Sequence, residues 1–400
     1  MKMKKNEIHV VYGEDIAGMT RHLLETADLA AMIPSRDVKI GIKPNLVGQV
    51  TAEDGATTHR EVVRALVEYL QEKGFGDLVV LESSWVGDST EQTVRFLGYD
   101  RMLEELGVPF WDLQKDRGVS RDCAGMEMQV CERVPQIGFL INVPVLKGHC
   151  QTRMTCALKN MKGLIPGSEK RRFHRLGLHE PIGHLAAGIR QDFILVDSIC
   201  GDLTMEDGGS PVQQDRLIAA CDPVLCDTYC CRLLEIDPAR VPYIGIAAGL
   251  GAGSADLDRA VVRAWREATG GEAGAPGERP AGGEAGAHAY LPAPDLTLKP
   301  TPSGWKDILR ISEKAEAVDS CSACYGYLIP ALQMLEQEGL LERLTEKVCI
   351  GQGYRGKRGV LGIGSCTRLF DHTLAGCPPT ETQMYQFLKD FILAGEQEAE

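Results

Sequence analysis

The stretches VKIGI at residues 38–42 and THREVVRALVEYLQEKGFGDLVVL at residues 58–81 decide the fold of this chain. The first is a short apolar run typical of a strand. In the second, apolar residues recur every three to four positions until Gly74, which predicts an amphipathic helix followed by a strand at Leu78–Leu81. Thr58 and Glu61 have the spacing of a capping box, so we expect the helix to begin there.

The same alternation of strands and helices extends outward to about residue 262. Further strands are expected at Ile8–Tyr12, Ile137–Val143 and Phe193–Val196, and an apolar helix face runs from Ile16 to Leu24. Near-continuous apolar runs indicate strands covered on both faces, as in a parallel sheet between two layers of helices. Residues 1–265 are therefore predicted to form a doubly wound α/β domain with a mostly parallel sheet.

The composition changes abruptly near residue 270. The stretch GGEAGAPGERPAGGEAGA at 270–287 has no large apolar residue, so residues 266–298 are predicted to be a mobile linker. Residues 299–400 are expected to form a second, smaller α/β domain, with helices at Leu328–Leu341 and Glu381–Leu393 on either side of a glycine-rich strand region.

Charge and hydropathy exclude several classes of protein. The formal net charge of −13 makes nucleic acid a poor partner, because an acidic surface repels phosphate. No run of about eighteen apolar residues predicts a membrane helix, and the start MKMKKNEIHV does not have the pattern of a secretory signal. We therefore expect a cytoplasmic protein, in which clustered cysteines indicate metal or redox chemistry rather than disulfides.

Five of the fourteen cysteines fall in the second domain. Cys321 and Cys324 form a C-x2-C pair, whose spacing lets two thiolates grip one metal centre. Cys366 follows Gly364-Ser365, and Cys377 lies in a Gly-Cys-Pro-Pro sequence. Cys349 lies in an apolar run and is expected in the core. We predict that the other four cysteines hold one [4Fe–4S] cluster; a [2Fe–2S] cluster, structural zinc and buried free thiols are the alternatives.

Residues 362–388, GIGSCTRLFDHTLAGCPPTETQMYQFL, resemble the segment around the proximal [4Fe–4S] cluster in small subunits of nickel–iron hydrogenases and in the matching subunit of respiratory complex I. In those proteins too, an upstream cysteine is followed by Gly-Cys-Pro-Pro and a helix. The resemblance implies a cluster ligated by Cys366 and Cys377, and it favours [4Fe–4S] over [2Fe–2S].

Polar residues follow several predicted strands of the first domain, at the carboxyl ends where α/β proteins bind ligands. They are Lys43, Asn45, Lys147, His149, Lys159, Asn160, His174 and Asp197. If they converge, the lysines and amides form a locally positive pocket for a small anion, with Asp197 as the nearest counter-ion among these motifs. We assign Lys43, Asn45, Lys159, Asn160 and Asp197 to substrate binding, and His149, His174 and Lys147 to catalysis.

These motifs, from about residue 38 to 262, resemble the DUF362 family (domain of unknown function 362). The resemblance rests on Lys43-Pro44-Asn45, the segment from Pro144 to His149, Ala157-Leu158-Lys159-Asn160, a following histidine and Asp197 ahead of a glycine-rich turn. It implies an α/β fold that is often accompanied by iron–sulfur ligands, but no reaction. This chain departs from tandem ferredoxin-type cysteine runs.

Three hypotheses for function follow. The first is an iron–sulfur oxidoreductase that couples the cluster to a small anionic substrate. The second is an electron-transfer protein that serves a redox partner such as a ferredoxin and has no substrate of its own. The third is a non-redox binding protein with structural zinc. His174, His179 and His184 recur every five residues, a spacing that drifts in angle around a helix, so three metal ligands from one continuous helix are not expected. Asp197 remains a candidate ligand for a second metal.

Overall fold

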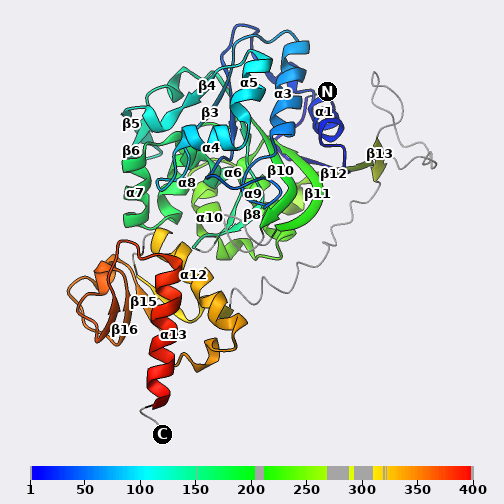
Figure 1. Cartoon of the computed structure of the whole chain (residues 1–400). Coiled ribbons are helices and arrows are strands. Elements are labelled where there is room, and N and C mark those ends of the chain that lie inside the picture. The colour runs from blue at the N-terminus through cyan, green and yellow to red at the C-terminus, as the bar shows by residue number, and fades with distance from the viewer. Residues whose placement is uncertain are drawn as a thin grey trace. The chain divides into compact units, whose positions relative to one another are not determined.

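The computed structural model describes residues 2–149, 151–202, 211–267, 288–291, 310–318, 320 and 322–397. It separates into two compact units (Figure 1). Unit 1 comprises 1–148, 153–170 and 179–300, and unit 2 comprises 149–152, 171–178 and 301–400. The predicted linker at Gly270–Ala287 lies outside the described residues, so the domain boundaries proposed from the sequence stay a prediction.

Unit 1 is built on one large sheet. Within the described residues its strands lie in the order β13 (His288–Leu291), β12 (Val261–Glu267), β1 (Glu7–Tyr12), β11 (Pro211–Ala220), β10 (Phe193–Asp202), β7 (Phe139–Val143), β2 (Ile40–Pro44), β3 (Leu78–Glu82) and β4 (Phe110–Asp112). The block from β10 to β4 is parallel throughout, and β11 and β13 pair antiparallel with their neighbours. The predicted mostly parallel α/β sheet is therefore confirmed.

The strand order reverses direction beside β2. From β2 the chain adds β3 and β4 on one side, then returns to place β7 and β10 on the other. This arrangement is a topological switch point, and in open α/β sheets ligands bind outside the carboxyl ends of the strands at such a point. Lys43 and Asn142 are paired across β2 and β7 at this place in the sheet.

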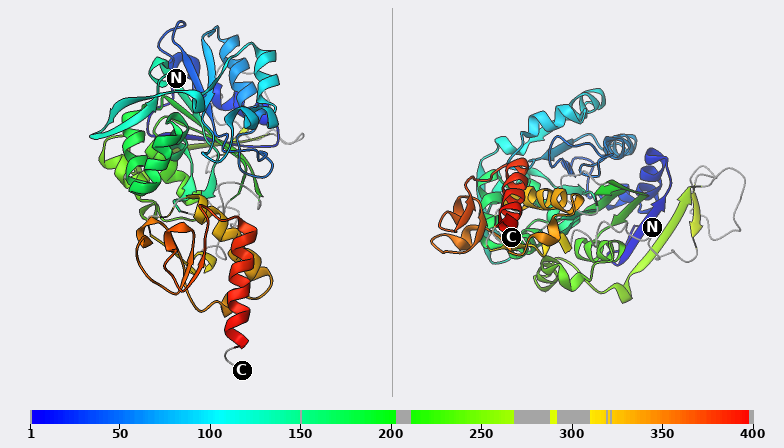
Figure 2. Two further views of the ribbon diagram at one scale, coloured as in Figure 1. Left: turned by 60° about the vertical axis from the view of Figure 1, so that its left-hand side comes forward. Right: turned by 60° about the horizontal axis from the view of Figure 1, so that its bottom comes forward.

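Helices cover both faces of the sheet (Figures 1 and 2). One layer contains α1 (Ile16–Thr26), α2 (Leu29–Met32), α3 (Arg60–Glu72), α4 (Thr90–Phe96) and α5 (Tyr99–Leu106); the other contains α6 (Ala157–Asn160), α8 (His179–Gly188), α9 (Pro223–Leu233) and α10 (Pro242–Gly249). Val62, Leu66 and Leu70 of α3 are fully buried, as the sequence pattern predicted. Their burial removes apolar surface from water, at about 25 cal/mol per Å².

The expected capping box of α3 is wrong. The N-cap residue is His59, and its side chain makes no capping hydrogen bond. The Thr58 hydroxyl instead donates to the carbonyl of Val143 at 2.9 Å and accepts from the backbone N–H of Asn45 at 2.8 Å. Thr58 therefore links β2 to β7 rather than closing a helix end.

Unit 1 also contains two pairs of short strands and the first part of a helix whose residues are divided between the two units. The strands β5 (Gly118–Cys123) and β6 (Met126–Cys131) form a hairpin, and β8 (Lys147–His149) pairs with β9 (Arg153–Thr155). The helix α7 (Gly167–Leu176) begins in unit 1, and its last residues belong to unit 2.

Unit 2 has its own sheet of four short parallel strands. In chain order and in space these are β14 (Ala315–Ala317), β15 (Val348–Ile350), β16 (Leu361–Ile363) and β17 (His372–Leu374). The helices α12 (Ser322–Gln337) and α13 (Glu381–Gln397) contribute buried apolar residues such as Leu332 and Leu388. The predicted smaller α/β unit is thus present in the described part of the chain.

Among the described residues, no helix is both long enough and apolar enough to span a bilayer.

Candidate functional site

A buried ion pair lies at the switch point of unit 1. Lys43 follows the apolar start of β2, is fully buried, and donates to the carboxylate of Glu82 at the end of β3 at 2.7 Å. Burial lowers the pKa of Lys43 below its ordinary value, and the charge of Glu82 opposes that shift. Two parallel strands thus each bring one charged residue to the same edge, where the charges compensate each other.

A chain of amides extends from this ion pair. Asn160 of α6 accepts from Lys43 at 3.1 Å and donates to Asn142 of β7 at 2.7 Å. Asn142 in turn donates to Gln191 at 2.6 Å. All of these side chains are buried, so each hydrogen bond replaces one that water would otherwise make. The structure therefore brings the predicted residues Lys43 and Asn160 into direct contact.

Lys170 was not predicted from the sequence. Its ammonium group donates to the Ser83 carbonyl at 2.5 Å, the Ser83 hydroxyl at 2.8 Å and the Ser84 carbonyl at 2.7 Å, directly after β3. Burial lowers its pKa to about 8, with Glu82 opposing and Lys43 reinforcing the shift. A cue existed, because Lys170 and the buried Phe173 are three residues apart on α7 and share a face.

Asp197 has a partner that the sequence did not reveal. One carboxylate oxygen accepts from the backbone N–H of His59 at 2.7 Å and lies 2.8 Å from Nδ1 of the same ring. Burial alone would lower the pKa of His59, but Asp197 outweighs it and the pKa is raised above its ordinary value. Asp197 therefore anchors the start of α3, while Asn45 is held nearby through Thr58.

The other predicted lysines also bind protein oxygens. Lys147 is buried and donates to the carbonyl of Ala56 at 2.5 Å, and Lys159 donates to the hydroxyl of Thr155 at 3.1 Å. The expectation that Asp197 is the nearest counter-ion was wrong, because Glu82 neutralises Lys43. Adjacent strand ends cannot be recognised as neighbours from sequence alone.

The two predicted proton donors belong to unit 2. His149 is buried, and its Nδ1 accepts from the backbone N–H groups of Gln151 at 3.1 Å and Thr152 at 3.0 Å. The neutral ring therefore carries its proton on Nε2. His174 lies in the part of α7 that belongs to the same unit. In unit 2, the Gln151 side chain also donates to the carbonyl and hydroxyl of Ser320, next to Cys321.

The histidines after His174 do not form one ligand set. His179 opens α8 and stacks on Tyr243 at 5.8 Å, and His184 lies 3.0 Å from the Cys123 carbonyl. Burial lowers the pKa of His179, and nearby Arg153 lowers it further. The break between α7 and α8 separates His174 from the other two, so the three histidines do not lie on one continuous helix, as predicted.

Two of the predicted cluster ligands, Cys366 and Cys377, lie just beyond strand ends of unit 2. Cys366 comes three residues after β16, and Cys377 comes three residues after β17. Cys324 lies in the first turn of α12, and Cys321 lies outside the described residues. Cys349 is in β15 as predicted but is only half-buried, so its assignment to the core was too strong. Because β14 to β17 are parallel, these strand ends lie along one edge of the sheet.

The Cys324 sulfur reaches the loops that carry the other two cysteines. A Cβ atom placed on Gly364 would lie 3.6 Å from this sulfur and 3.7 Å from the carbonyl oxygen of Gly376. The backbone N–H of Ser365 donates to the same carbonyl at 2.7 Å, so the two loops are tied together. The segments of Cys324, Cys366 and Cys377 thus meet at one place.

The described cysteines of unit 2 do not by themselves form a compact site for a single zinc ion. Four thiolates on one zinc ion at about 2.3 Å lie about 4 Å apart. Within the described residues, the sulfurs of Cys324, Cys366 and Cys377 do not all lie within 4.8 Å of one another. Thiolates are the ligands of iron–sulfur clusters as well as of zinc, so the donor types present are those that a [4Fe–4S] group needs.

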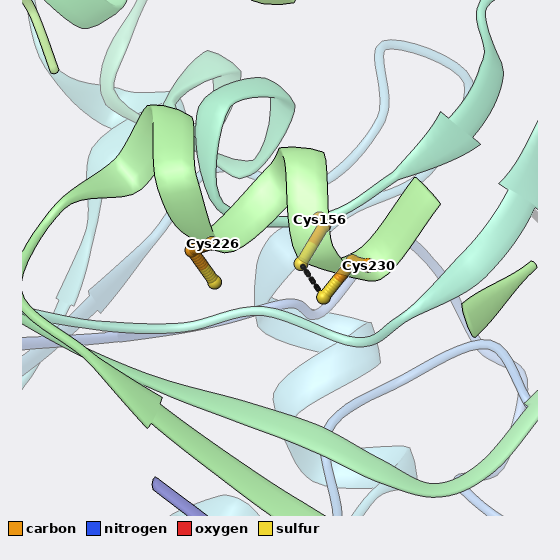
Figure 3. Close-up of side chains that lie close together, drawn as sticks. All are labelled: Cys156, Cys226 and Cys230. Carbon is orange, nitrogen blue, oxygen red and sulfur yellow. Dashed lines mark hydrogen bonds between the residues drawn. The ribbon is translucent and has the colours of Figure 1, made fainter. Parts of the chain in front are cut away.

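A second cysteine group lies in the core of unit 1. Cys156, Cys226 and Cys230 are fully buried, and their sulfurs all lie within 4.8 Å of one another (Figure 3). The Sγ atoms of Cys156 and Cys230 are 3.6 Å apart. Cys226 and Cys230 lie on the buried helix α9, whereas Cys156 comes from a distant part of the chain, and sequence reasoning did not single out Cys156. Only the four-residue spacing of Cys226 and Cys230 was visible in advance.

Fold and cysteines together define an α/β protein with a group of cysteines able to bind metal. Residues 40–232 match the model of a family described as Domain of unknown function (DUF362). The chain is 27% identical over 224 residues to the Thylakoid-associated protein sll1697 of Synechocystis, covering 53% of this chain and 68% of that protein.

Among solved structures, the lactate racemase apoprotein from Thermoanaerobacterium thermosaccharolyticum matches 50% of this chain and 53% of its own, at 13% identity and a TM-score of 0.33. This likeness is too weak to bear on the fold or activity of this chain.

Proposed function

We propose that this chain is an iron–sulfur redox protein in which Cys321, Cys324, Cys366 and Cys377 hold one [4Fe–4S] cluster. The observation that carries the proposal is the Cys324 sulfur beside Gly364, where the loops of Cys366 and Cys377 meet. The C-x2-C spacing supports Cys321 as the fourth ligand. When bound, such a cluster supplies single electrons at a potential tuned by nearby hydrogen bonds and solvent.

The α/β unit is proposed to bind a small anionic substrate at the carboxyl edge of its sheet. Lys43 and Asn45 lie at the end of β2, beside the switch point, and Asn160 of α6 is hydrogen-bonded to Lys43. Lys159 of α6 and Asp197, midway along β10, complete the proposed set. In unit 1, Lys147 is proposed to handle protons, and in unit 2 the same role is proposed for His149 and His174. His149 holds its proton on Nε2 in the neutral ring, so this atom would donate it.

A second candidate function is electron transfer without a substrate, with a redox partner such as a ferredoxin. One observation favours it: the ammonium groups of Lys43, Lys147 and Lys170 already donate to protein oxygens. A group that is satisfied inside the protein offers less to an incoming anion.

The test begins with protein purified under anaerobic conditions. We expect about four irons and about four sulfides per chain, and a visible absorption band that is lost on reduction. Cys377→Ser should remove most of this absorption. Cys349→Ser, on the neighbouring β15, is the matched control and should retain it. Stoichiometric zinc in protein made with ample iron would overturn the proposal.

The enzyme and carrier hypotheses are then distinguished by which compound changes the absorption band of the cluster. Bleaching of the oxidised cluster by a small anion that can be oxidised, or recovery of the band when the reduced cluster meets a small anion that can be reduced, without any partner protein, supports the enzyme. Response to a ferredoxin alone supports the carrier.

A further inference from the structure

We propose that Cys156, Cys226 and Cys230 form a three-coordinate site for a thiophilic d10 metal ion, and that this ion is Cu(I). The site is in unit 1 and shares no residue with the proposed iron–sulfur ligands. It would be a second metal centre, independent of the proposed function.

The geometry comes from two anchored segments. Cys226 and Cys230 are four residues apart on α9, so their side chains leave the same side of the helix (Figure 3). Cys156 is the residue just before α6. Three sulfurs around one ion at about 2.3 Å lie about 4 Å apart, which agrees with 3.6 Å for Cys156 and Cys230 and 4.8 Å as the limit for all three.

Asp227 fixes the distance between the two segments. Its carboxylate accepts from the backbone N–H groups of Ala157 at 2.8 Å and Leu158 at 3.2 Å. Asp227 is next to Cys226, and Ala157 is next to Cys156, so this bond pair clamps α6 onto α9 beside the three sulfurs. The sulfurs are therefore held in place before any ion arrives, as a preorganised site requires.

The donor set selects the ion. Among the described residues, no histidine nitrogen or carboxylate oxygen lies within 4.8 Å of all three sulfurs, although the Asp227 carboxylate is hydrogen-bonded to Cys156. Soft thiolates favour Cu(I), zinc or iron–sulfur clusters over hard cations. Zinc in structural sites takes four ligands, whereas this group offers three. Coordination number and softness together point to Cu(I).

The experiment uses the full chain under anaerobic conditions. Cu(I) is titrated against a chromophoric Cu(I) chelator for the wild type and for Cys226→Ser, Cys230→Ser and Cys231→Ser. The wild type should bind one more equivalent of Cu(I) tightly than Cys226→Ser or Cys230→Ser does. In these two variants the affinity for that equivalent of Cu(I) should fall at least a hundredfold. Cys231→Ser is the matched control, because it is buried on the same helix but outside the group, and should bind like the wild type. The C-terminal cysteines are unchanged in every variant, so their binding cancels in the difference.

A second measurement guards against variants that fold poorly. X-ray absorption of the wild type loaded with one equivalent of Cu(I) should show about three sulfurs near 2.3 Å. Equal Cu(I) stoichiometry in all four proteins overturns the proposal. So does preferential retention of four-coordinate zinc, or an absorption spectrum of two-coordinate copper.

Discussion

The two parallel sheets of this chain use the same architectural position for different chemistry. At the carboxyl edge of the large sheet, Lys43 and Glu82 pair with each other, and the amides beside them are bonded in a chain. At the corresponding edge of the small sheet, the strand ends lead into cysteine loops, and Cys377 is exposed. We call the first edge closed, because Lys43 and Glu82 are already paired inside unit 1, and the second open, because the Cys377 thiol is exposed. The topology sets where a site lies, and the residues at the strand ends decide whether it is closed.

The largest expected effect would break the closed edge. Lys43→Met leaves Glu82 buried without its counter-ion, and we expect a loss of about 3–5 kcal/mol in the free energy of unfolding. The double variant Lys43→Met with Glu82→Gln should recover most of it, because no buried charge remains. Chemical denaturation of the four proteins in a double-mutant cycle measures this.

The matched control for that cycle is an exposed pair. Arg21 and Glu72 form two hydrogen bonds at 2.6 and 2.8 Å on the surface, and Arg21→Ala should change stability by at most about 1 kcal/mol. If Lys43→Met lowered the free energy of unfolding as little as Arg21→Ala, the buried Glu82 would not depend on Lys43 as its counter-ion.

Acid should weaken unit 1 through His9 on β1. Neither ring nitrogen of His9 has a hydrogen-bond partner among the described residues, and the ring packs edge-on against Trp265 at 5.2 Å. Burial lowers its pKa to about 4, with Glu7 opposing the shift and Arg263 reinforcing it. Between about pH 6.5 and about pH 4, the His9 ring is protonated in the unfolded chain but neutral in the folded chain. The free energy of unfolding therefore decreases as pH falls through this range.

The expected size of the His9 effect is up to about 3 kcal/mol across that range. His9→Phe keeps the aromatic contact with Trp265 and removes the titrating group. Denaturation midpoints measured at several pH values should therefore fall less steeply in the variant. Parallel curves for both proteins would refute the role of His9.

The smallest expected change in stability comes from a substitution in the cysteine loops of unit 2. Gly364 has φ of +96° and ψ of 160°, a conformation that is essentially restricted to glycine. Gly364→Ala should lower stability by about 1–3 kcal/mol and also reduce iron content, because its Cβ would contact the Cys324 sulfur. Gly356→Ala, also at positive φ but with open space around its Cβ, is the control and should leave iron content unchanged.

Local patterns predicted the elements better than the contacts between them. The apolar runs at 78–81 and 137–143 became β3 and β7, since continuous burial leaves a strong signal in the sequence. Thr58 was misassigned because its hydroxyl had two possible uses, a helix cap or a link to β7, and tertiary structure chose the second. Nothing local distinguishes these outcomes.

In the candidate site, too, the sequence predicted individual residues better than the contacts between them. Lys43 and Asn160 were named from their positions after predicted elements, and the structure joins them. Glu82 was visible at the end of its strand, but its pairing depends on which strands are neighbours. Cys156 lies seventy residues before Cys226, so only the packing of α6 on α9 brings the two sulfurs together.

The make-up of unit 2 has a consequence for how such a protein is inherited. Besides residues 301–400, this unit takes 149–152 and 171–178 from the region that matches DUF362. Gln151 from the first of these segments is hydrogen-bonded to Ser320. A gene fragment that encodes the last hundred residues would therefore carry an incomplete unit to a new host gene. We expect the cysteine-bearing part and its two segments to be gained and lost together, rather than exchanged as an interchangeable module.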